Sequence, residues 1–124
     1  MSQTPTPAKR EVASVGALLW IRSMDEPVAP DSLGGQTAAE QERIVREHIA
    51  MDELTLDRIL YGVGTDAGDS DTRLRIMLQM LEQVPVRHLY VSGALYAHDT
   101  EDDRMKHHVV LLMHGMRLTI CEDE

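Results

Sequence analysis

The sequence predicts an α+β fold in which two or three helices pack on a C-terminal three-stranded antiparallel meander. Three observations lead to this fold class. One apolar series recurs at helical spacing and ends before Pro85: Leu74, Met77, Leu78, Leu81 and Val84. From His88 the period changes to two, as in a half-buried strand. Finally, His114-Gly115 separates two apolar runs and can form a two-residue hairpin turn.

Length and composition indicate one folded domain. The chain has 124 residues, of which 43% are hydrophobic, enough to fill a core. We expect a flexible tail over residues 1–10 and a single globular domain over 11–124. The apolar run Val12–Ile21 fits a helix or a buried strand equally well, because periodicity does not separate the two in so short a segment.

The middle of the chain is predicted to be helical. Thr37 and Glu40 have the spacing of a capping box, and Ile44, Val45 and Ile49 follow at helical spacing. After a break near Asp52 the helical pattern is predicted to continue to about Val63. A polar loop over 65–71 then leads to the helix that Pro85 ends, and Asp66, Asp69 or Ser70 is expected to cap it.

The C-terminal third has two interpretations. The meander takes 88–98, 109–113 and 116–120 as strands, with a charged turn at 99–103. The alternative is a helix from Glu101, because Thr100 and the acidic residues that follow it resemble a helix N-terminus. An all-α bundle is the corresponding alternative for the whole fold.

Charge and composition exclude several function classes. The chain carries 12 Lys+Arg against 21 Asp+Glu, a net charge of −9, and only 3% of its residues are aromatic. Direct binding of nucleic acid or an anionic membrane surface needs the opposite charge. No apolar run is long enough for a transmembrane helix. A single cysteine, Cys121, fits the reducing cytoplasm, and its acidic neighbours should raise its pKa and reduce its reactivity.

The acidic turn next to the predicted sheet is the most distinctive feature. It predicts a small cytoplasmic regulatory or inhibitory protein that binds a basic protein surface, steered by charge. The expected contacts are Asp99, Glu101, Asp102 and Asp103, with Tyr96 as an anchor. Solubility alone also explains such charge. Homodimerisation through a sheet edge or a Met-rich helix face would be compatible with this function, because it buries more apolar area.

A second hypothesis places a small molecule or a metal ion on one face of the predicted sheet, in a binding domain or a small enzyme. One hairpin register would gather imidazole and phenol groups there: Tyr90, Tyr96, His98, His108 and His114. His98 and His108 with Asp99 or Asp102 could in principle bind Zn²⁺. No metal-ligand spacing supports this, so we predict no metal, no cofactor and no catalytic residue.

Overall fold

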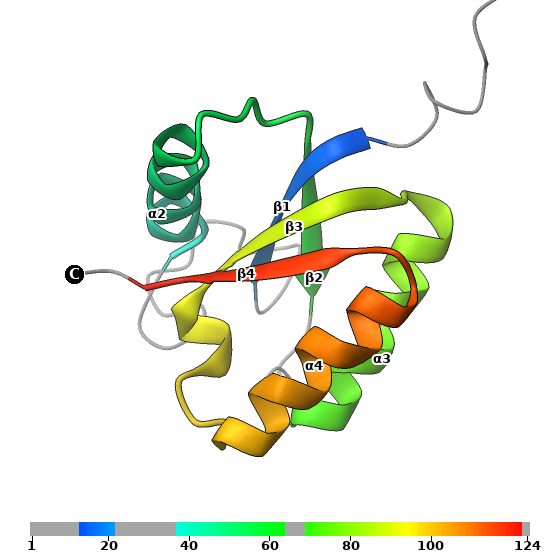
Figure 1. Ribbon diagram of the computed structural model, residues 1–124. Helices are drawn as coiled ribbons and strands as arrows, with labels where there is room; N and C mark the ends of the chain where they lie inside the picture. The colour runs from blue at the N-terminus through cyan, green and yellow to red at the C-terminus, as the bar shows by residue number, and fades with distance from the viewer. Residues whose placement is uncertain (1–12, 22–36, 64–68, 123–124) are drawn as a thin grey trace, which may run out of the picture.

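The computed structural model describes residues 13–21, 37–63 and 69–122. These residues form a four-stranded, all-parallel sheet in the order β2-β1-β3-β4 (Figure 1). The strands are β1 (Ala13–Ile21), β2 (Arg58–Val63), β3 (Val86–Ser92) and β4 (Arg117–Cys121). They are connected through the helices α2 (Ala38–Met51), α3 (Ser70–Gln83) and α4 (Glu101–Met113), with a 3₁₀ turn, η2 (Gly93–Tyr96), after β3. The fold is therefore α/β.

The predicted antiparallel meander is wrong. Residues 101–113 form helix α4 rather than a turn and a strand, so the chain crosses over between β3 and β4 and the two strands run parallel. The alternative interpretation, a helix from Glu101, is confirmed. The Thr100 hydroxyl accepts a hydrogen bond from the Asp103 amide at 3.1 Å, and three acidic residues occupy the first turn, where the helix dipole favours them.

Two further segments, one predicted as helix and one left ambiguous by the sequence, are strands. Residues 58–63, predicted as the end of a helix, form β2, which pairs in parallel with β1. The ambiguous run up to Ile21 is the central strand β1, flanked by β2 and β3. A central strand of a parallel sheet is covered on both faces, which explains why its apolar residues are continuous rather than alternating.

The helix signals in the middle of the chain are confirmed. Thr37 and Glu40 form the capping box of α2, and Asp52 is its C-cap. Helix α3 ends at Gln83, before Pro85. Asp69 occupies its N-cap position, although the side chain makes no capping hydrogen bond. The proposed tail over 1–10 and the candidate cap Asp66 lie outside the described residues.

The helices cover the two faces of the sheet unequally. On one face Ile44, Val45 and Ile49 of α2 pack against β1 and β3. On the other face lie α3 and α4 (Figure 1). They enclose the larger core, which includes Leu18, Trp20 and Leu89. Among the described residues, α2 is the helix that covers the first of these faces. The β3–β4 side of the α2 face therefore carries partly exposed polar residues, among them His88 and Thr119.

Gln41 of α2 holds the carboxyl-terminal part of β1. The paired residues of β1 and β3 end at Leu18 and Val91. Beyond them, the buried Gln41 carboxamide accepts from the Trp20 amide and donates to the Trp20 carbonyl, each at 2.8 Å. This divergence of β1 and β3 is the switch point of strand order, where open α/β sheets commonly bind ligands. Here a side chain of the protein itself enters it.

Candidate functional site: the exposed face of helix α4

The acidic residues predicted to bind a partner are not all exposed on one surface. Glu101 and Asp102 are exposed on the first turn of α4, and Asp103 is half-buried. Asp99 instead forms a buried ion pair with Arg73, in which the two side chains are 4% and 0% exposed. Tyr96 is fully buried beneath the Arg73 guanidinium, which lies 4.6 Å from its ring centre. Neither Asp99 nor Tyr96 therefore presents a surface to a partner in this structure.

The buried group continues from Tyr96 to His107, which is also inaccessible to solvent. The Nε2 atom of His107 lies 3.0 Å from the Ser70 carbonyl, which can only accept, so Nε2 carries the proton. Nδ1 then accepts from the Tyr96 hydroxyl at 2.8 Å. Burial, followed by the nearby Arg73 cation, lowers the pKa of His107. Ser70 Oγ also lies 3.0 Å from Nε2, but this neutral tautomer has no lone pair there to act as its base.

The histidine and tyrosine side chains of the ligand hypothesis are not brought together. Tyr90 lies on the α2 face and donates to Asp52 at 2.5 Å, whereas Tyr96 is buried on the opposite face. His98 is exposed after η2, while His108 and His114 lie on α4 and at its C-cap. No group of three or more His, Cys, Asp or Glu side chains suited to a metal ion occurs within 13–21, 37–63 and 69–122.

Cys121 is fully buried at the end of β4. Burial, with smaller contributions from Asp52 and Glu122, raises its pKa to about 12. The direction predicted from the sequence is confirmed, although the main cause is burial rather than the neighbouring acidic residues. The thiol is therefore poorly placed to act as a nucleophile.

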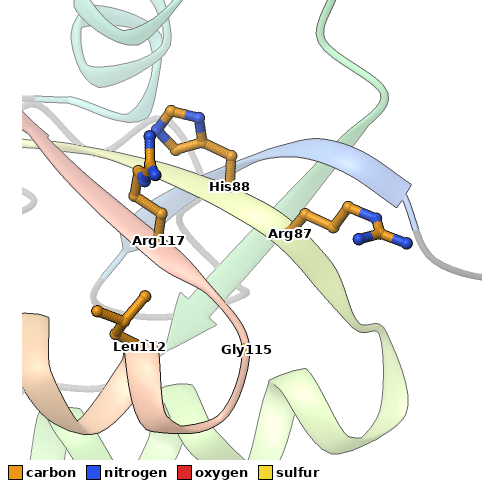
Figure 2. Close-up of a pocket in the computed structure, with 5 residues that line it drawn as sticks. All are labelled: Arg87, His88, Leu112, Gly115 and Arg117. Atoms are coloured by element: carbon orange, nitrogen blue, oxygen red, sulfur yellow. The ribbon is translucent and has the colours of Figure 1, made fainter.

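A shallow hollow of about 300 Å³ lies at the amino-terminal end of β3 and β4 (Figure 2). It is lined by Arg87, His88, Leu112, Gly115 and Arg117. His88 and Arg117 lie side by side above the sheet, and Leu112 reaches the hollow from the end of α4 (Figure 2). Burial and the Arg117 cation lower the pKa of His88, so the positive charge at neutral pH comes from the two arginines.

The outer face of α4 carries an apolar stripe that the described part of the chain leaves open to solvent. Its members are Met105, Val109, Leu112 and Met113, which are 61%, 46%, 62% and 77% exposed. With Asp102, the series 102, 105, 109 and 112 has the alternating three- and four-residue spacing of a helix seam that packs against another helix. Single exposed apolar residues are ordinary, whereas these four lie together on one side of a helix.

Charged residues lie near both ends of α4. Glu101 and Asp102 stand at the N-terminus of α4, and Arg87 and Arg117 flank the hollow at its C-terminus. Within the described residues, none of these four side chains forms an ion pair. Other acidic and basic pairs on the surface are formed, such as Lys106 with Asp71 and Arg104 with Glu122. Arg117 projects beside His88 from the opposite face of the sheet, so the α4 surface, meaning the stripe with Glu101 and Asp102, is the strongest candidate site.

Sequence reasoning found Glu101 and Asp102 but missed the stripe and the arginines. The reason is that the sequence predicts a strand over 109–113, in which Val109 and Met113 would alternate with residues on the other face. Once Thr100 is accepted as a helix cap, the apolar spacing from Met105 to Met113 is visible in the sequence. The approach of Arg87 and Arg117 depends on the β3–β4 pairing, which no local pattern encodes.

Comparison of the chain with known protein families, with curated proteins and with solved structures gave no match. None of the helices in the described ranges has both the length and the hydrophobicity needed to cross a membrane.

Proposed function

We propose that this protein is a small interaction module that binds a partner protein through the α4 surface. The single observation that carries the proposal is the exposed stripe of Met105, Val109, Leu112 and Met113. Covering such a stripe removes apolar area from water, which is the main favourable term in most protein associations. A buried, neutral histidine network and a buried thiol support binding rather than catalysis as the role of this domain.

The charges define the partner's chemistry. Glu101 and Asp102 extend the stripe at one end and have no ion-pair partner in the described part of the chain. The partner should therefore present an apolar groove or helix flanked by basic side chains at that end, because charges across a protein interface are complementary. The single, buried Cys121 is compatible with a cytoplasmic location.

Site-specific photocrosslinking in the source cells tests this proposal. A photoreactive amino acid at Leu112 should give one dominant crosslinked product of defined mass, because this side chain is an exposed member of the stripe. The matched control places the same group at Glu47, an exposed position on α2. Adding Asp102→Lys should weaken the Leu112 product.

The proposal is contradicted if the Leu112 and Glu47 probes give the same diffuse pattern of products. It is also contradicted if the Leu112 product is unchanged by both Asp102→Lys and Val109→Lys. Circular dichroism of each variant establishes that the fold is retained.

A further inference from the structure

We infer that His107 is a pH-sensitive anchor of helix α4, which holds the helix on α3 at neutral pH and releases it in weak acid. The inference goes beyond the proposed function, because it concerns how α4 is attached and not what its outer face binds. Two observations carry it: the small number of buried side chains on α4, and the enclosed network of hydrogen bonds around His107.

Helix α4 has few buried side chains to hold it in place. Its buried residues are His107 and Leu111, which are four residues apart and so lie on one face. Val110 packs beside them as a half-buried side chain. Helix α2, of similar length, buries five of its 14 residues. Because elements with few buried contacts open first, α4 should open before the sheet, and one of its two buried anchors is an imidazole.

The His107 ring joins α4 to two other elements. Its Nε2 donates to the Ser70 carbonyl of α3 at 3.0 Å, and its Nδ1 accepts from the Tyr96 hydroxyl of η2 at 2.8 Å. Both hydrogen bonds require the neutral imidazole. If Nδ1 took a proton, the Tyr96 hydroxyl would have to turn its own proton toward the Met77 sulfur, a weak acceptor 3.8 Å away.

The charges around the ring do not compensate for its burial. Arg73 of α3 opposes protonation, and the nearby carboxylate of Asp99 is already paired with it. In the first turn of α3, Asp71 is paired with Lys106 of α4. Asp103, one turn before the ring on α4, favours the imidazolium. Burial and the Arg73 cation outweigh the acidic groups, so the packed helix favours the neutral ring.

Release of α4 makes the ring accessible to water, where its pKa returns to about 6.5. In the packed state the pKa of His107 lies below its ordinary value. Between the two values the released state binds a proton that the packed state does not, so a fall in pH shifts the equilibrium toward release. For one proton this shift is at most about tenfold between pH values of about 7.5 and about 5.5. The α4 surface is lost in those molecules in which the helix is released.

Hydrogen exchange of the wild-type chain, measured by mass spectrometry at about pH 7.5 and about pH 5.5, tests the inference. Rates are corrected for the intrinsic pH dependence of exchange. Amides of residues 101–113 should be less protected than those of β1 and β3 at both pH values, because α4 opens on its own. Their protection should fall by about three- to tenfold between the higher and the lower pH.

Two substitutions assign this fall to one side chain. His107→Gln should remove the pH dependence of α4 protection, although the helix is less protected at every pH. The matched control, His108→Gln, removes the neighbouring half-buried imidazole of the same helix and should leave the pH dependence unchanged. Circular dichroism shows whether each variant folds.

The wild-type chain alone also decides the matter, should His107→Gln fail to fold. Protection of α4 equal to that of β1 would overturn the inference, because the helix would then open only with the whole molecule. Protection of α4 that does not change with pH would overturn it as well. A His107 ring that titrates at about pH 6.5 in the folded chain, followed by nuclear magnetic resonance, would have the same meaning.

Discussion

His107 uses both of its ring nitrogens inside the protein. Nε2 donates to the Ser70 carbonyl and Nδ1 accepts from the Tyr96 hydroxyl, so the folded state holds the neutral imidazole. The groups around it include Arg73 of α3, whose charge opposes protonation, and Asp99 and Asp103, which favour it less strongly. Because burial is the largest cause, the pKa of His107 in the folded state lies below its ordinary value.

This shift predicts a loss of stability in weak acid. Between the lowered pKa and about 6.5, the unfolded chain binds more protons than the folded one, so the free energy of unfolding decreases as the pH falls. Stability from this residue is fully present above about pH 6.5 and is lost below it. Urea unfolding between about pH 7.5 and about pH 5.5 measures the slope.

His107→Gln should reduce the slope, although the variant is less stable at every pH because a buried hydrogen bond is lost. His88, whose pKa is also lowered, contributes in the same direction, so the double variant with His88→Gln should be flatter still. An unchanged slope in His107→Gln would show that the imidazole is not protected from protonation in the folded state.

At the scale of the elements, α2 is joined to the sheet by a side chain as well as by apolar packing. Gln41 supplies a donor and an acceptor to Trp20 at the point where β3 turns away into η2. The carboxamide thus continues the ladder that a neighbouring strand would otherwise provide. The carboxyl-terminal edge of β1 depends on this contact.

Gln41→Leu should therefore destabilise the protein, although leucine has a similar size and a higher hydrophobicity. Each hydrogen bond to a buried backbone group that is removed costs about 1–3 kcal/mol. Thermal unfolding followed by circular dichroism measures the change. Glu47→Gln on the same helix breaks an exposed ion pair and should change the free energy of unfolding by less than about 0.5 kcal/mol. Equal effects of the two substitutions would contradict the structural role of Gln41.

The elements also show where sequence reasoning succeeds. The N-cap of α2 at Thr37 and the end of α3 before Pro85 depend on hydrogen bonds and steric clashes within a few residues, so the sequence predicts them. The direction of β4 depends on whether residues 101–113 form a turn or a helix. Both interpretations agree with the local acidic cluster, and only the packing of His107 and Leu111 against the rest of the protein decides between them.

At the scale of the whole molecule, the predicted strand over 109–113 also explains why the sequence does not reveal the candidate site. A strand over 109–113 would have buried alternate residues, whereas the helix buries Leu111 and exposes Val109, Leu112 and Met113. Tyr96 and Asp99 lie near Asp102 in the sequence, but their side chains are buried whereas Asp102 is exposed. The residues that form the α4 surface lie on one side of a single helix, and they come together only when residues 101–113 are helical.

The central claim is that the stripe on α4 is a surface for a partner and not part of the protein's own core. The most direct test compares two adjacent leucines by urea unfolding at low protein concentration, where association does not contribute. Leu111 is 0% exposed and Leu112 is 62% exposed, so the pair is matched in residue type, helix and position. Leu111→Ala should cost about 2–5 kcal/mol, as expected for a buried side chain. Leu112→Ala should change the free energy of unfolding by no more than about 0.5 kcal/mol. A loss of about 2 kcal/mol or more for Leu112→Ala would show that the stripe packs within its own chain, and it would contradict the account.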